Sequence, residues 1–266
     1  MKKYGLIGYP LSHSFSKKYF SDKFEKEHIK GSEYELYPIG HITELPALLK
    51  DHPGLCGLNV TIPYKQSVLK YLDRIEEDAK KIGAVNCIRI HAANSIDANS
   101  DGEAGTIGHD FRLEGFNTDL YGFEMSLKPL LTNRQDHALV LGDGGAAKAV
   151  KCVLENLGIT YTLVTRKPQH DSVLYKDLKP HHIEDNLLII NTTPLGMTPH
   201  IDECPPIPYE NITGDHLLYD LVYNPEKTVF LQKGEQQGAM IKNGLEMLIL
   251  QAEKSWEIWT KKDLLS

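Results

Sequence analysis

The residues of this sequence whose types and spacing most directly indicate chemistry form a glycine turn at residues 142–145, within ALVLGDGGAAKAV at residues 138–150. Glycine is favoured there because the turn needs positive φ, and because a backbone without Cβ lets a pyrophosphate approach the N–H groups at a helix N-terminus. Gly142 and Gly144 match the first two glycines of the dinucleotide fingerprint, and Ala147 takes the third place, where alanine is allowed. Any βα turn can carry glycines, so this motif alone leaves nucleotide binding open.

The type of nucleotide is indicated at the end of the strand expected at residues 160–164. An NAD site places an acid there, about 20 residues past the glycines, to accept from the ribose 2′-OH. Here Thr165, Arg166 and Lys167 follow, and the first acid is Asp171. Two cations can pair with a 2′-phosphate, so the pattern favours NADP as the cofactor. Without the glycine turn, the same residues would indicate a charged surface loop.

Composition excludes several classes of protein. The chain has 266 residues, 41% of them hydrophobic, which is enough for one large or two ordinary domains. A net charge of −7 without a long basic cluster argues against a nucleic-acid partner. Four cysteines without a CxxC pair suit reduced cytosolic thiols better than a disulfide framework or a zinc site.

Targeting and metal sites are also not expected. The apolar run at the N-terminus stops at Pro10, and no run approaches the roughly 20 apolar residues of a membrane span. His181 and His182 are adjacent, but no metal-ligand spacing accompanies them, so we interpret them as solvated loop residues. We therefore expect a soluble, cytoplasmic protein with no membrane contact and no metal.

Hydrophobic patterning predicts alternating strands and helices, which is typical of an α/β fold with a parallel sheet and helices on both faces. A solvent-exposed hairpin loop is expected at residues 92–108, which are rich in Asn, Asp, Ser and Gly. Strands are predicted at residues 4–9, 34–38, 55–62, 84–90, 160–164, 187–190 and 216–221, with another ending at 142. Helices are predicted at residues 17–28, 43–50, 66–71, 76–81, 120–131, 226–237 and 244–259, with another ending at 157.

Several motifs occur in an order that resembles the shikimate dehydrogenase family, from the first strand to the last helix. They are SHSFS at residues 12–16, where the family usually reads HSxSP, NVTIPYK at 59–65, GAVN at 83–86, GFNTDLYGF at 115–123, the glycine turn, NTTPLGM at 191–197, YDLVYNP at 219–225 and GLEMLILQA at 244–252. The combination of NVTIPYK, a later NTD and a terminal GLxMLxxQA is highly specific.

The resemblance implies two α/β domains with the active site in the cleft between them. Residues 1–118 would form the substrate domain, with a mostly parallel sheet, completed by the C-terminal helix at 245–266. Residues 119–244 would form a Rossmann-like NADP-binding domain. The implied reaction interconverts 3-dehydroshikimate and shikimate in the chorismate pathway of aromatic amino acid biosynthesis, carried out by a monomer or homodimer.

Ketone reduction needs a hydride donor and a proton source for the oxygen. By resemblance, Lys65 is the general acid/base at that oxygen, and Asp119 holds both its ammonium and the substrate hydroxyl. Ser14 and Ser16 would bind the shikimate carboxylate, although a helix N-cap at Ser16 is an equally open interpretation. Amides and hydroxyls suit a polyol ring, and the remaining substrate-facing positions are Asn59, Thr61, Asn86, Tyr223 and Gln251.

The same resemblance assigns the cofactor-binding residues. Leu221 and Gly244 would line the nicotinamide pocket. The full set is Gly142, Asp143, Gly144, Gly145, Ala146, Thr165, Arg166, Lys167, Leu221 and Gly244.

Some positions depart from the family pattern. Lys17 replaces the proline after SxS, which would loosen the turn that carries Ser14 and Ser16. Asp143 stands where a small residue is usual, and its carboxylate would repel a pyrophosphate unless the side chain points away. Thr165 replaces an asparagine, and residues 92–108 are an insertion relative to the family.

Two alternatives remain at this stage. One is the quinate/shikimate branch of the same family, which uses NAD or both nucleotides, and Arg166 with Lys167 argues against it. The other is a nucleotide-binding sensor or scaffold of the same fold without catalysis. Lys65 and Asp119 argue against that alternative, because binding alone needs neither.

Overall fold

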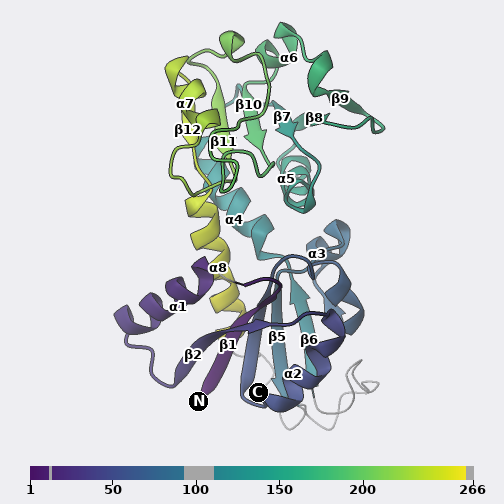
Figure 1. Ribbon diagram of the computed structural model, residues 1–266, viewed down its shortest axis with the longest axis vertical. Coiled ribbons are helices and arrows are strands. Elements are labelled where there is room, and N and C mark those ends of the chain that lie inside the picture. Colours follow the sequence, from purple (N-terminus) through teal and green to yellow (C-terminus); the bar gives the residue numbers. More distant parts are fainter. Residues whose placement is uncertain (12–13, 93–110, 262–266) are drawn as a thin grey trace. The chain divides into compact units, whose positions relative to one another are not determined.

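A computed structural model of the chain describes residues 1–11, 14–92 and 111–261. The chain divides into two compact units, one formed by Met1–Thr118 with Ala252–Ser266 and the other by Asp119–Gln251. Each unit is built on its own six-stranded sheet (Figure 1). The α/β class expected from the alternating pattern is confirmed.

The sheet of the first unit is mixed, with the order β2-β1-β3-β5-β6-β4. Strand β1 pairs in parallel with β2 and β3, β5 is antiparallel to β3 and β6, and β4 is parallel to β6. The strands are β1 (Lys2–Gly8), β2 (Ser32–Pro38), β3 (Leu55–Val60), β4 (Arg74–Ile75), β5 (Cys87–Ala92) and β6 (Phe111–Phe116).

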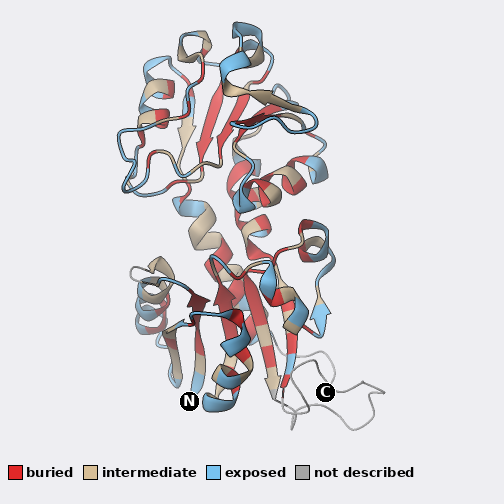
Figure 2. Cartoon of the chain, turned by 45° about the vertical axis from the view of Figure 1, so that its right-hand side comes forward, coloured by how far each residue is buried: buried red, intermediate tan, exposed pale blue. Residues whose placement is uncertain are grey.

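Two hydrophobic clusters enclose this sheet, and Figure 2 shows its central strands as mostly buried. Aromatic rings dominate one cluster, in which the centroid of the Trp259 ring lies 5.1 Å from that of Tyr4 and 5.5 Å from that of Phe20. The helical elements of this unit are α1 (Phe15–Lys26), η1 (Ile42–Glu44), α2 (Leu45–Asp51), η2 (Ser67–Tyr71) and α3 (Glu77–Ile82).

The sheet of the second unit is parallel throughout, with the order β12-β11-β10-β7-β8-β9. Successive strands are added in one direction from β7 to β9 and in the opposite direction from β10 to β12, so the strand order reverses between β7 and β10. Open α/β sheets bind ligands at such a switch point, beyond the carboxyl ends of their strands. The strands are β7 (His137–Leu141), β8 (Thr160–Thr165), β9 (Ser172–Leu174), β10 (Leu188–Asn191), β11 (Leu217–Asp220) and β12 (Met240–Lys242).

In chain order, helices α5, α6 and α7 lie between strands of the parallel sheet, whereas α4 precedes its first strand and α8 follows its last. Helices α4 and α8 each carry residues of both units. The helical elements of this half of the chain are α4 (Thr118–Leu127), η4 (Lys128–Leu130), α5 (Gly145–Asn156), η5 (Tyr175–Asp177), α6 (Pro180–Glu184), η6 (Tyr209–Asn211), α7 (Val229–Gln236) and α8 (Leu245–Thr260).

Most predicted elements occur within a few residues of their expected positions, but sequence patterning missed the short ones. Strands β4, β9 and β12 have two or three residues each, too few to show a period, and β6 and α6 were not predicted. Residues 245–251, expected in the first domain, belong to the second unit. The predicted hairpin loop at 92–108 lies almost entirely outside the described residues. Among the helices that are described, none is both long and apolar enough to span a membrane.

Candidate active site

The topology of the first unit gathers its predicted polar residues at one edge of the sheet. Strands β1, β3 and β6 run in the same direction and end at this edge, and β5, which is antiparallel to its neighbours, begins there. Thr61 therefore follows the end of β3, Asn86 precedes the start of β5, and Thr118 lies just beyond the end of β6. Chain connectivity alone would scatter these residues, and the strand pairing brings their loops together.

Ser14, and not Ser16, caps helix α1. Its backbone is extended, with φ −118° and ψ 118°, and its hydroxyl accepts from the Lys17 N–H at 3.5 Å. A proline there would have no N–H to donate to Ser14, and the Lys17 ammonium instead pairs with the Glu35 carboxylate at 2.6 Å.

A buried chain of hydrogen bonds connects several predicted substrate residues. The Tyr34 hydroxyl donates to Asn59 Oδ1 at 2.9 Å and also shares a hydrogen bond with the Ser16 side chain. Asn59 Nδ2 donates to Ser255 Oγ at 2.9 Å and to the Asn86 carbonyl at 3.3 Å, so both of its amide hydrogens are used. Asn59 is only 4% exposed. Its amide is therefore a link within the protein framework.

Asn86 fixes the start of helix α4. Its Oδ1 accepts from the Thr118 N–H at 2.7 Å, and its Nδ2 lies 3.1 Å from Thr118 Oγ1. Asp119 follows directly and occupies the first turn of α4, where the helix dipole favours a carboxylate. The position of the predicted catalytic aspartate thus depends on a residue that the sequence assigned only to substrate binding.

The loop that carries Lys65 is held at both ends by backbone hydrogen bonds. The Thr61 N–H donates to the Ile7 carbonyl at 3.0 Å, and the Lys65 carbonyl accepts from the Val85 N–H at 2.8 Å. Thr61 and Lys65 themselves are both of intermediate exposure. A side chain on such a loop starts from a fixed backbone, as an acid/base group requires.

The glycine turn of the second unit has the geometry that its sequence predicts. Gly142 has φ +97°, and a Cβ at this position would lie 2.8 Å from Thr193 Cγ2, so only glycine fits. Gly144 is the N-cap of α5, and a Cβ at Gly144 or Gly145 would meet no described atom within 4 Å. The N-terminus of α5 is therefore open, as an approaching pyrophosphate needs. Ala147 is fully buried.

Asp143 does not point freely over this turn. Its Oδ1 accepts from Lys151 Nζ, two helical turns into α5, at 2.8 Å. Both side chains are about one quarter exposed, at 23% and 24%. The negative charge that the sequence places in the turn is paired along the side of the helix.

The segment after β8 is shaped by Thr165. This residue is 4% exposed, and its hydroxyl donates to the Lys167 carbonyl at 2.7 Å and lies 3.1 Å from Ser172 Oγ. Arg166 and Lys167 are exposed, so their charged groups can reach a ligand. The structure gives Thr165 the role of holding the turn that presents these two cations.

A buried polar cluster that sequence reasoning missed connects the loops after β10 and β11. The Asp220 carboxylate is fully buried and accepts from Asn191 Nδ2 and the Val222 N–H, each at 3.0 Å, and from the Thr228 hydroxyl. Burial raises the pKa of Asp220 to about 6, and the hydrogen bonds partly oppose that rise. The sequence did carry a signal for this cluster, because a polar residue ends each of two neighbouring apolar strands.

The residues predicted near the nicotinamide have different environments. A Cβ on Gly244 would overlap the Leu221 carbonyl, so this helix start must be glycine. Tyr223 is 38% exposed. Gln251 is 7% exposed, and its amide donates to the Leu248 carbonyl of its own helix at 2.9 Å.

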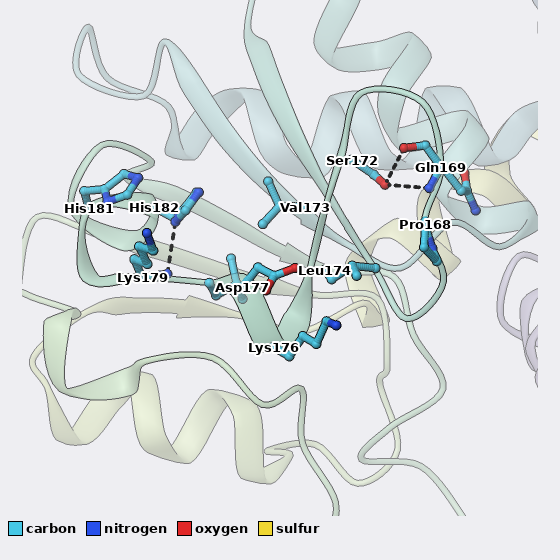
Figure 3. A pocket seen from close by; sticks show the side chains of 11 residues that line it. Pro168, Gln169, Ser172, Val173, Leu174, Lys176, Asp177, Lys179, His181 and His182 are labelled. Carbon is cyan, nitrogen blue, oxygen red and sulfur yellow. Dashed lines mark hydrogen bonds between the residues drawn. The ribbon is translucent and has the colours of Figure 1, made fainter.

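A separate concave region of about 740 Å³ lies along β9, η5 and α6 (Figure 3). The first of its lining residues in the chain is Pro168, directly after Lys167, and none of the predicted site residues lines it. His181 and His182 line it from helix α6 and not from a loop as predicted, with ring centroids 4.1 Å apart. His182 Nδ1 accepts from the Lys179 N–H at 3.0 Å, which is a helix-capping role. Within the described part of the chain, no three His, Cys, Asp or Glu side chains are grouped to hold a metal.

The parallel sheet, its switch point and the open glycine turn define the second unit as a Rossmann-type nucleotide-binding fold. Residues 6–88 match the family model described as the shikimate dehydrogenase substrate binding domain. A relative from Clostridium beijerinckii named shikimate dehydrogenase (NADP(+)) is 39% identical, over 99% of this chain and 94% of the relative. The chain belongs to the shikimate dehydrogenase family.

Solved structures agree with this assignment. Shikimate 5-dehydrogenase from Thermus thermophilus, in complex with NADP(H) and shikimate, has a TM-score of 0.79 and 29% identity, covering 98% of this chain and 94% of that chain. Shikimate 5-dehydrogenase from Listeria monocytogenes, in complex with shikimate and NAD, has a TM-score of 0.81 and 27% identity, covering 98% and 92%. The sequence-based identification of the family is confirmed.

Proposed function

We propose that this protein is an NADP-dependent oxidoreductase that interconverts 3-dehydroshikimate and shikimate in the pathway to chorismate and the aromatic amino acids. The observation that carries the proposal is the sheet edge of the first unit, where the loops of Thr61, Lys65 and Asn86 meet beside the start of α4. Near full-length similarity to enzymes named shikimate dehydrogenase (NADP(+)) supports it. These relatives do not favour the quinate alternative.

Lys65 is proposed as the acid/base group. When bound, the nicotinamide supplies a hydride to the carbonyl carbon or takes one from the alcohol carbon. Lys65 donates a proton to the oxygen as the ketone becomes an alcohol, and accepts it in the reverse direction. Asp119 accepts from a substrate hydroxyl and keeps the Lys65 ammonium oriented. The substrate domain is proposed to be the first unit.

The substrate carboxylate is proposed to bind at the N-terminus of α1. Ser14 and Ser16 supply hydroxyls there, and the first N–H groups of a twelve-residue helix favour an anion. Thr61, Asn86, Tyr223 and Gln251 are proposed to contact the ring hydroxyls. Asn59 is proposed to act through the framework, since its amide hydrogens already bind Ser255 and the Asn86 carbonyl.

The second unit is proposed to bind NADP. The turn at residues 142–146 fits a pyrophosphate, because the N-terminus of α5 is open and Gly142 permits the close approach of the backbone. Arg166 and Lys167 would pair with the 2′-phosphate, next to the turn that Thr165 holds. Leu221 and Gly244 would border the nicotinamide.

The assay that tests this function follows nicotinamide absorbance with shikimate or quinate, each with NADP⁺ or NAD⁺. We expect turnover of shikimate with NADP⁺ to give the largest kcat/KM. Absence of shikimate turnover with either nucleotide would contradict the enzyme assignment. Faster turnover with NAD⁺ would overturn the cofactor, and a preference for quinate would move the chain to the other branch of the family.

The cellular setting is also a proposal. Cys56, Cys87, Cys152 and Cys204 form no disulfide in the described part of the chain, which suits a reducing cytoplasm. We propose that the chain acts there on small molecules, as a monomer or homodimer without nucleic acid. Sedimentation of the purified protein measures the assembly directly.

A further inference from the structure

The N-terminus of α5 combines an open anion site with an acidic neighbour in the chain. Gly144 is the N-cap and has no side chain to accept from the first N–H groups of the helix. Those groups attract any nearby anion through their unsatisfied donors and the helix dipole. Asp143 directly precedes the cap, and aspartate is among the residues that readily accept from helix N–H groups. Left unrestrained, this carboxylate would compete with a ligand phosphate for the same donors.

In the structure, Lys151 binds that carboxylate instead. Lys151 Nζ lies 2.8 Å from Asp143 Oδ1. Side chains on a helix lean toward its N-terminus, so a lysine two turns into α5 reaches back along the helix and meets Asp143 beside it. Both side chains are about three quarters buried, so water screens the pair less than it would a fully exposed one.

We propose that Lys151 is a positioning residue for the cofactor: its ion pair holds the Asp143 carboxylate away from the N-terminus of α5 and keeps the phosphate-binding amides available. This inference rests on the proposed binding of NADP at the glycine turn. Lys151 itself need not touch the cofactor. Its effect is transmitted through Asp143, which distinguishes it from a lysine that binds phosphate directly.

A double-mutant cycle separates these two roles. NADPH binding is titrated by its fluorescence for the wild type, Lys151→Met, Asp143→Asn and the double variant, and thermal melting checks that each is folded. We expect Lys151→Met to raise the Kd about tenfold when Asp143 is present, and less than twofold in the Asp143→Asn background. Lys148→Met, which removes another positive charge from α5, serves as the matched control and should give the same Kd ratio in both backgrounds.

The outcomes are distinct. An equal loss of affinity from Lys151→Met in both backgrounds would overturn the proposal and indicate direct phosphate contact or a general charge effect. An unchanged Kd in the Lys151→Met single variant would also overturn it. A wild-type protein that binds no NADPH would contradict the proposed function itself. The KM for shikimate should stay constant across the cycle, since neither Asp143 nor Lys151 is among the residues proposed to contact the substrate.

Discussion

Two helix N-termini in this molecule, those of α1 and α5, are each proposed to receive an anion, yet they are built differently. Helix α1 begins with a side-chain cap at Ser14, and the next serine is joined to buried Tyr34. Helix α5 begins at Gly144, in a turn open to close approach of the backbone. A single carboxylate can be bound by oriented hydroxyls, whereas a pyrophosphate needs several backbone N–H groups free of side chains.

The two regions also differ in the interactions made by the polar and charged side chains around each helix N-terminus. In the first unit, Asn59 and Asn86 use protein partners to fix the loops around the site. In the second, the acid within the turn is drawn aside by Lys151. Near the N-terminus of α1, polar side chains are fixed by protein partners. At the N-terminus of α5, the acidic side chain is held away from the site.

The largest expected effect concerns the proton-transfer step, which is proposed to depend on neither of the two helix N-termini. Lys65→Ala should lower kcat by about 10²- to 10⁴-fold, the usual range for loss of a general acid/base. The affinity for shikimate, measured by calorimetry, should change little, because neither helix N-terminus is altered. Lys70→Ala, on the adjacent η2, is the control and should keep normal kcat. Near-normal kcat in Lys65→Ala would remove this residue from proton transfer.

The next effect tests the α5 side of the comparison. Arg166→Ala should raise the KM for NADP⁺ roughly tenfold or more, the size expected for one charge-assisted pair with the 2′-phosphate. The KM for NAD⁺ should not change. Arg134→Ala is a suitable control, because that guanidinium binds the Asp215 carboxylate in the same unit. Equal increases for both nucleotides would mean that the 2′-phosphate is recognised elsewhere.

A smaller effect tests whether the α1 site depends on its buried framework. Tyr34→Phe removes the hydroxyl that binds Ser16 and Asn59 while keeping the ring. We expect the KM for shikimate to rise about fivefold, of the order of one neutral hydrogen bond, with the KM for NADP⁺ unchanged. Tyr4→Phe removes a buried hydroxyl from the same aromatic cluster and should leave both constants unaltered. Similar changes in the two variants would indicate a general loss of packing.

A last effect concerns stability and not activity, and it tests whether the second unit also relies on a buried polar framework. Because the pKa of Asp220 is raised by burial from 3.8 to about 6, its contribution to stability is full below pH 4 and lost as pH rises through 6. The loss is at most roughly 3 kcal/mol. Asp220→Asn should remove this pH dependence. Urea unfolding from pH 4 to 7 measures it, and parallel curves for the two proteins would refute the assignment.

Sequence patterning predicted much of this fold because long strands and helices carry a period of hydrophobicity. The strand β7 and helix α5 follow from one apolar run and one alanine-rich segment. Strands β9 and β12 could not be predicted, because three residues show no period and their pairing comes from β8 and β11. The cap of α1 was misplaced by two residues, since both serines fit the same local rule.

The residue types of the candidate site were readable from the sequence, and their roles at Lys65, Asp119 and Ser14 stay predictions. Local chemistry along the chain determined the glycine turn, the cations after β8 and the class of fold, because each depends on neighbouring residues. Only the tertiary structure decided which partner each polar group has. Tyr34 meets Asn59, and Asp143 meets Lys151, because strand pairing and helix packing bring distant residues within hydrogen-bond distance.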